Sequence, residues 1–463
     1  MSGSHQIVAL AEFKPIAASR AWVSIPNPNG LPLIATATSD KTVRVYSLKN
    51  FTLHSTLEGG HSRSVRSVAW KPTIGKKESA TLCLATGSFD ATMGIWRRRE
   101  DASNGGDIEA EEGRAELEAE VEITSSGATK SLPRLRRHND EDDDDDSASA
   151  EDWEFAIVLE GHDSEVKNVS YSPSGQWLAS CSRDKSIWIW EEIGDEGEDE
   201  FETIAVLQEH TADVKCVCWR PDDGNGEVLA SASYDDTIRF WKGDEEGEWS
   251  CVAVLEGHSG TVWSLEWEPE VSQNKFAADG NDGEGSVEGG ERDYSPRIPR
   301  LMSASADNTI RVWSKQPTPP QPNRPSYINS GIPSTMRPPP SNETWEVSTT
   351  LPEAHTLPIY SISWSKKSGR VVSAGGDGTI VVYEEVIKGR SSVGGAIERV
   401  WEVIAVLEGA HGPYEINHVT WCTRFDSGKR YEGEEIIVST GDDGVVRAWV
   451  LEETGQKDII PLA

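Results

Sequence analysis

The chain has 463 residues and carries 78 acidic against 44 basic side chains, which gives a formal net charge of −34. This charge repels phosphate backbones and anionic lipid, so we expect neither nucleic acid nor a membrane surface among the partners. We find no apolar run long enough to span a membrane, no secretory signal and no Cys-x-x-Cys pair among the six cysteines, so we expect buried free thiols, no bound metal and no cofactor.

A short pattern recurs seven times along the chain. In each copy an aromatic residue follows an aspartate by six positions, and a Ser or Thr precedes that aspartate by four. Seven matches at one fixed spacing indicate a structural unit that is repeated seven times. In chain order the pairs are Asp40 and Tyr46, Asp90 and Trp96, Asp184 and Trp190, Asp235 and Trp241, Asp307 and Trp313, Asp377 and Tyr383, and Asp443 and Trp449.

A histidine opens six of the seven units. A β-branched residue follows this histidine by four positions, and an aromatic residue follows the β-branched one by five. In the last unit the β-branched residue follows the histidine by five positions instead of four, and the first unit lacks the histidine. The six histidines are His61, His162, His210, His258, His355 and His411.

Each unit is interpreted as a loop followed by three short strands, a, b and c. Apolar stretches such as 204–207 and 252–255 supply a fourth strand, d, before the next histidine. Seven such units predict an all-β fold, a seven-bladed WD-repeat β-propeller that forms a single domain over residues 1–463. The segment 7–10 resembles the other d strands, so we expect it to complete the last blade and to close the ring, which removes an open sheet edge.

The histidines and aspartates of the repeat are expected to have a structural role. In WD-repeat proteins the recurring His, Asp, Ser or Thr and Trp form a hydrogen-bonded tetrad within each blade. A neighbouring Ser, His and Asp also suggests a catalytic triad, but the same set repeats around the ring, which favours packing. We therefore predict no catalytic residue and no enzyme activity. The tetrad aspartates that face a histidine are Asp90, Asp184, Asp235, Asp307, Asp377 and Asp443.

Three long insertions interrupt the repeat. Residues 97–152 are strongly acidic and include an Asp run at 142–146, residues 270–297 are rich in Gly and acids, and residues 314–344 are rich in Pro. Such compositions favour disorder, because they bury too little apolar area to offset chain entropy. The acidic run could bind a basic or histone-like partner and the Pro-rich segment could present polyproline ligands; a solvated loop and a passive spacer are favoured instead.

All three insertions fall in a–b or c–d connections, which lie on one face of a propeller. We call this the lower face; the upper face carries the d–a and b–c connections. Three positions of each blade project from the upper rim toward the central opening: those on either side of the strand-a β-branched residue, and the one before the Asp. In blade 7 they are Glu415, Asn417 and Asp442.

The upper-rim positions combine basic and aromatic side chains. All the bases come from blades 1 to 4, in a chain that is acidic overall, and Arg beside Trp and Tyr is typical of binding hot spots. We therefore expect an acidic, aromatic peptide or protein surface to dock here; a scatter of rim residues with no shared ligand is the alternative. The candidate partner-binding residues are Arg20, Trp22, Arg66, Phe89, Lys167, Arg183, Lys215, Tyr234, Trp263 and Tyr360.

Several blades resemble one particular family. Residues 161–192, 229–242 and 256–269 are similar to the WD-repeat subunit of the cytosolic iron–sulfur protein assembly targeting complex. The resemblance implies a non-catalytic adaptor, monomeric outside the complex, that binds a small partner with a reactive cysteine and a large helical-repeat partner. Together these deliver [4Fe–4S] clusters to cytosolic and nuclear apoproteins, some of which resemble acidic-aromatic C-terminal ligands. It also implies a functional arginine in the SRDK turn, here Arg183.

Two other classes of function remain as alternatives. A different WD-repeat adaptor, such as a substrate receptor of a ubiquitin ligase or a reader of histone peptides, would use a similar upper-face site and would differ in the proteins that copurify. An enzyme would need an acid, a base and a nucleophile that converge in a pocket outside the tetrads, and the sequence shows no such set. The resemblance places the protein in the cytoplasm, with the nucleus as a further expected location.

Overall fold

The chain is described by a computed structural model, which places residues 5–17, 19–73, 81–99, 153–193, 200–222, 226–244, 247–269, 298–316, 343–390 and 397–454. Within these ranges the chain forms 28 β-strands and no helix. No helix in the described part of the chain is long and apolar enough to cross a membrane.

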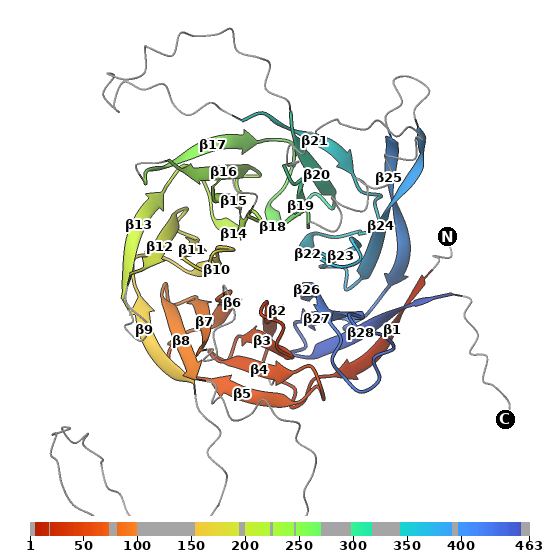
Figure 1. Cartoon of the computed structure of the whole chain (residues 1–463), viewed down its shortest axis with the longest axis horizontal. Coiled ribbons are helices and arrows are strands. Elements are labelled where there is room, and N and C mark those ends of the chain that lie inside the picture. The colour runs from red at the N-terminus through yellow and green to blue at the C-terminus, as the bar shows by residue number, and fades with distance from the viewer. Residues whose placement is uncertain are drawn as a thin grey trace, which may run out of the picture.

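The strands form seven antiparallel sheets of four strands each, arranged as blades around a central opening (Figure 1). In each blade strand a lies nearest the centre and strand d lies at the outer rim. The first three blades comprise β2 (Ala21–Pro26), β3 (Leu33–Thr38), β4 (Val43–Ser47) and β5 (Leu53–Leu57); β6 (Val65–Trp70), β7 (Thr81–Ser88), β8 (Met93–Arg99) and β9 (Glu154–Leu159); and β10 (Val166–Tyr171), β11 (Trp177–Ser182), β12 (Ile187–Glu192) and β13 (Phe201–Leu207).

The other four blades repeat this order. They comprise β14 (Val214–Trp219), β15 (Val228–Ser233), β16 (Ile238–Gly243) and β17 (Trp249–Leu255); β18 (Val262–Trp267), β19 (Leu301–Ser305), β20 (Ile310–Lys315) and β21 (Trp345–Thr350); β22 (Ile359–Trp364), β23 (Val371–Gly375), β24 (Ile380–Arg390) and β25 (Ile397–Leu407); and β26 (Ile416–Thr423), β27 (Glu435–Gly441) and β28 (Val446–Glu453) with β1 (His5–Glu12).

The last blade is completed by the N-terminal strand. β1 pairs with β28 in an antiparallel register that runs from His5 opposite Glu453 to Glu12 opposite Arg447. The seven-bladed fold and its closure by an N-terminal strand, both predicted from the sequence, are therefore confirmed. Because a strand from the start of the chain completes a sheet from its end, the ring has no seam that depends on a loop alone.

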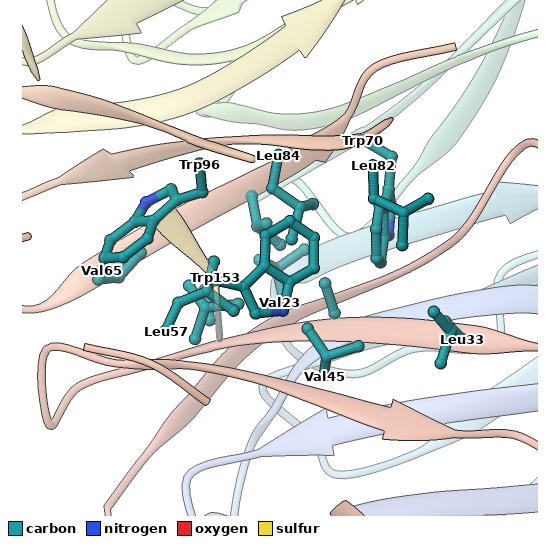
Figure 2. Packing of buried hydrophobic residues seen from close by; sticks show 14 residues of the cluster. Val23, Leu33, Val45, Leu57, Val65, Trp70, Leu82, Leu84, Trp96 and Trp153 are labelled. Carbon is teal, nitrogen blue, oxygen red and sulfur yellow. The ribbon is translucent and has the colours of Figure 1, made fainter. Parts of the chain in front are cut away.

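The core of the protein lies between neighbouring blades. Every residue of β3 and of β15 is buried, because the middle strands of a blade are covered on both faces by the adjacent blades. Figure 2 shows the cluster between blades 1 and 2, in which Val23, Val45 and Leu57 of one blade meet Trp70 and Leu84 of the next. Apolar side chains on both faces of a strand are therefore required at every blade, which is why alternation is weak in the b strands.

The three predicted insertions fall almost entirely outside the described residues. β8 continues to Arg99 and β20 to Lys315, so the described strands extend slightly into the ranges 97–152 and 314–344. These segments leave the blades between β8 and β9, between β18 and β19, and between β20 and β21. All three connections are of the a–b or c–d type and belong to the lower face.

Candidate functional site at the upper mouth of the channel

Every innermost strand carries a β-bulge at its second residue. In β10, for example, Val166 pairs with Ser182 and Asn168 with Cys181, so that Lys167 has no partner on β11. A bulge leaves the extra residue unpaired and changes the direction of its side chain. The seven bulged residues are Trp22, Arg66, Lys167, Lys215, Trp263, Tyr360 and Asn417.

The bulged residues meet at one cavity. The cavity has a volume of about 250 Å³ and is lined by all seven of them together with Arg20, Phe89 and Glu415. Each blade therefore contributes to it, at the end of strand a where the d–a and b–c connections lie. We call this cavity the channel mouth; the same backbone irregularity, repeated seven times, points different side chains at one place.

Three of the four basic residues at the channel mouth are paired with a carboxylate. The Arg20 guanidinium lies 2.6 Å from Asp442, the Lys215 ammonium 3.1 Å from Asp213, and the Lys167 ammonium 4.0 Å from Glu165. The positive charge of these three side chains is thus largely balanced within the protein.

Arg66 differs from these three because it has no carboxylate partner in the described part of the chain. Its guanidinium lies 4.9 Å from the centroid of the Trp22 ring. Burial lowers the pKa of Arg66 to about 10, and no neighbouring carboxylate counters this effect. The side chain remains cationic at neutral pH and is incompletely solvated.

Aromatic rings form two walls of the channel mouth. On one side Arg20 and Arg66 lie 4.7 and 4.9 Å from the Trp22 centroid, and Lys167 lies 4.6 Å from that of Phe89. The Trp22 indole donates a hydrogen bond of 2.8 Å to Ser64 Oγ, which fixes the ring. Cations at these distances interact favourably with the ring faces.

The opposite wall is formed by Trp263 and Tyr360. Their rings meet edge to face, with centroids 5.2 Å apart, and Lys215 lies 5.1 Å from the Trp263 centroid. The indole nitrogen of Trp263 is buried and has no hydrogen-bond partner within the described residues. Burial, with the nearby Glu415, raises the pKa of Tyr360 to about 12, so the phenol keeps its proton.

Eight of the ten candidate partner-binding residues line the channel mouth; Arg183 and Tyr234 do not. The Arg183 side chain is 59% exposed and lies 3.3 Å from Glu165. Tyr234 is also exposed and lies 5.3 Å from the Lys215 ammonium. Both belong to b–c turns, which stand at the rim. Glu415 and Asn417 do line the cavity, although they were not among the candidates; the positions that predict the other lining residues also identify these two.

The b–c turns of six blades are held by a hydrogen-bonded tetrad. In blade 5, His258 Nδ1 donates to Asp307 at 2.8 Å, and the Ser303 hydroxyl bridges His258 Nε2 at 2.7 Å and the Trp313 indole at 2.8 Å. The Asp307 carboxylate also accepts from the backbone N–H of Ser259 at 3.1 Å. The tetrad therefore ties the d–a loop to the b–c turn.

The same arrangement recurs in blades 2, 3, 4, 6 and 7. The His–Asp pairs are His61 with Asp90, His162 with Asp184, His210 with Asp235, His355 with Asp377 and His411 with Asp443. Burial raises the pKa of each carboxyl, but hydrogen bonds from the imidazole, from backbone amides and, in most blades, from a nearby hydroxyl outweigh burial and hold the pKa below its usual range.

Blade 1 has no tetrad histidine, and its aspartate is contacted by an arginine and two threonines. The Arg44 guanidinium lies 3.2 Å from the Asp40 carboxylate, which also accepts hydrogen bonds from Thr38 and Thr42. The sequence shows that this blade lacks the histidine, but the contact of Arg44 with Asp40 was not predicted. An arginine four residues after the aspartate also contacts that aspartate in blades 5 and 7, as Arg311 and Arg447 do, so this spacing is the signal that could have identified the contact.

The described residues contain no group of three or more His, Cys, Asp or Glu side chains arranged to hold a metal ion. All six cysteines are free thiols. Burial raises the pKa of Cys216 to about 12, so this thiol stays protonated at neutral pH.

Comparison with known proteins identifies the repeat. The family model described as "WD domain, G-beta repeat" matches residues 153–191, 201–242, 249–283, 292–314 and 345–384. A protein of Botryotinia fuckeliana, named "Probable cytosolic iron-sulfur protein assembly protein 1", is 66% identical over 96% of this chain and 97% of its own length. Proteins of the same name from Sclerotinia sclerotiorum and Pyricularia oryzae are 64% and 47% identical, over 96% and 97% of this chain and 95% and 97% of their own lengths.

Proposed function

This chain belongs to the WD-repeat family of cytosolic iron-sulfur protein assembly proteins, and from that premise we propose that it is a non-catalytic scaffold of that machinery. In this role it binds other subunits of the assembly complex and iron–sulfur apoproteins, and helps to deliver [4Fe–4S] clusters to them. It works in the cytoplasm, and we propose that it also serves apoproteins in the nucleus.

The observation that carries this proposal is the channel mouth. A propeller that acts only as a spacer has no need of four cations and four aromatic rings gathered in one cavity, in a chain whose net charge is −34. Cations and aromatic faces together suit a ligand that carries a carboxylate beside an aromatic side chain. We therefore propose that acidic-aromatic C-terminal peptides of the partners dock at the channel mouth.

Arg183 and Tyr234 extend this proposed surface to the upper rim. Both side chains are exposed, and both stand next to residues of the channel mouth, Arg183 through Glu165 and Tyr234 through Lys215. A partner whose chain end enters the cavity would pass these two residues. Arg and Tyr are enriched among the residues that contribute most to binding, but such residues lie mostly near the centre of an interface, so these two are proposed as rim contacts.

The proposal is tested by affinity capture of the tagged chain, read by mass spectrometry, beside a variant that carries Arg183→Glu and Lys215→Glu. We expect the wild type to capture assembly subunits and iron–sulfur apoproteins, and the variant to lose part of them. Capture of ubiquitin-ligase subunits or histones instead would overturn the proposed role. Equal capture by both forms would refute the proposed position of the site.

A further inference from the structure

We propose that Arg66 is the primary carboxylate-binding residue of the channel mouth, and that the exposed Arg183 is a secondary contact. This inference rests on the proposed function, which it makes specific to one side chain. It concerns the free carboxylate at the end of a docked peptide.

The charge balance at the channel mouth favours Arg66 over the other three cations as the carboxylate-binding residue. A ligand carboxylate that approaches Arg20, Lys167 or Lys215 has to compete with Asp442, Glu165 or Asp213, each within 4.0 Å. Arg66 has no such competitor among the described residues, and burial has already removed part of its water. A charge-assisted hydrogen bond to Arg66 therefore replaces no internal ion pair, and the ligand takes the role of the missing counter-ion.

The side chains around Arg66 hold its guanidinium in place. Its guanidinium lies beside the Trp22 ring at 4.9 Å, and the Trp22 indole is fixed by Ser64, so one face of the fork is supported. Across the same cavity stand the Trp263 and Tyr360 rings, which offer an apolar wall to an aromatic side chain next to the carboxylate.

The cavity at the channel mouth is small. Its volume of about 250 Å³ lies below the usual range of small-molecule pockets. It therefore admits one end or one side chain of a peptide rather than a longer stretch of chain. Comparison of a free C-terminal acid with its amide separates these two sources of a carboxylate.

Arg183 lies in a different electrostatic setting. Arg63, Lys167 and Arg183 all approach Glu165, at 4.0, 4.0 and 3.3 Å, so this carboxylate already occupies the place of an anion. The Arg183 side chain is 59% exposed, where a single ion pair contributes little. Arg183 therefore attracts an acidic partner to the rim but does not fix its end.

The test uses the full chain and a fluorescent pentapeptide, Gly-Ser-Gly-Glu-Phe, with a free C-terminal carboxylate, beside the same peptide as its C-terminal amide. In the wild type we expect the amide to bind at least about tenfold more weakly. In Arg66→Met we expect the free peptide to weaken by a similar factor and the difference between acid and amide to disappear. Arg66→Gln serves as a second variant, and both are compared with wild type in thermal unfolding.

Arg183→Met is the matched control. We expect it to weaken both peptides by less than about threefold and to keep the preference for the free acid. If Arg66→Met and Arg66→Gln keep that preference, or if Arg183→Met loses it, the inference is overturned while the proposed site stands. If the wild type binds neither peptide, the proposed peptide site fails and this inference fails with it.

Discussion

The upper and lower faces of this propeller are built from the same blades but under different constraints. On the upper face a tetrad aspartate accepts hydrogen bonds from the d–a loop and from its own b–c turn, as Asp307 does from Ser259 and Thr309. The segments 100–152, 270–297 and 317–342 all leave from the lower face. The tetrad limits the length of the upper connections, and blade 7 keeps its tetrad with one extra residue in the d–a loop. The upper face therefore differs between blades mainly in its side chains, whereas the lower face carries the long added segments.

The largest loss of stability is expected for a substitution of a buried, ion-paired arginine on the lower face. Arg300, buried just before β19, lies 2.8 Å from Glu268 and bonds both carboxylate oxygens of Glu385 in the next blade. Removing it takes a guanidinium away from two buried carboxylates. Arg300→Met should therefore lower the free energy of unfolding by about 3–5 kcal/mol, measured by urea denaturation.

The control for Arg300 is the exposed pair of Lys388 and Glu402, 3.3 Å apart on the same face. Lys388→Met should cost less than about 1 kcal/mol, because exposed ion pairs contribute little. Equal effects of the two substitutions would mean that the Arg300 cluster has no special role and that the lower face is uniformly tolerant.

The second-largest loss of stability is expected for a substitution in an upper-face tetrad. His258→Ala leaves the Asp307 carboxylate without its imidazole donor and Ser303 without one of its two partners. We expect a loss of about 2–3 kcal/mol in the free energy of unfolding. Arg44→Ala in blade 1 is the comparison, because Arg44 is partly exposed and its pair with Asp40 is 3.2 Å long; a loss there as large as that of His258→Ala would contradict the ranking.

A pH-dependent effect is expected for Glu266 on the innermost strand of blade 5. This half-buried residue lies on β18, and burial raises its pKa to about 7, above the ordinary 4.5. The protonated Glu266 carboxyl makes its full contribution to stability below pH 4.5, where it is protonated in the folded and in the unfolded protein. This contribution is lost as the pH rises from 4.5 through 7, because the unfolded protein releases the proton more easily than the folded one. Glu266→Gln should therefore be more stable than wild type at pH 8, by about 2 kcal/mol after allowance for solvent contact, and equal to it at pH 4.5.

The measurement for Glu266 is the urea midpoint of both proteins across this pH range. A difference between them that stays constant with pH would show that the carboxyl does not titrate in this window.

The smallest effect is expected for a shortened insertion on the lower face. Deleting residues 106–147 shortens the connection between β8 and β9 to less than a quarter of its length. Each halving of a loop lowers the entropic cost of closing it by about 0.6 kcal/mol. We expect stability to rise by about 1 kcal/mol in calorimetry, with unchanged capture of partners. A loss of either would assign the acidic segment a role in folding or in binding.

The fold was predictable because its signal is periodic. The spacing of Asp to aromatic, as in Asp184 and Trp190, follows from a b–c turn of fixed length, and a fixed turn leaves the same mark in every blade. The placement of β1 in the last blade followed from the resemblance of residues 7–10 to the d strands of the other blades. The contact of Arg44 with Asp40 was not predicted because arginine is not part of the repeated His, Asp, Ser or Thr and Trp pattern, although Arg311 and Arg447 stand at the same spacing in blades 5 and 7.

The site was predictable in part for a related reason. Residues such as Lys167 follow the strand-a β-branched residue by one, and the bulge at that point turns them to the channel. The position before the aspartate is less informative: Phe89 reaches the cavity because it packs against Trp22 at 5.9 Å, whereas Arg183 stays at the rim. The Arg300 cluster joins residues from two blades, and no local pattern marks such a contact.

The central claim, that the channel mouth is where iron–sulfur apoproteins dock, is tested most directly in cells whose own copy of the protein is depleted. Radioactive iron incorporated into a cytosolic [4Fe–4S] protein is measured after complementation with wild type, with Arg66→Glu and Lys215→Glu together, or with the lower-face pair Lys49→Glu and Lys388→Glu. At equal protein levels we predict that the channel-mouth variant loses most incorporation and that the lower-face variant keeps the wild-type level. Full incorporation with the channel-mouth variant would contradict the account.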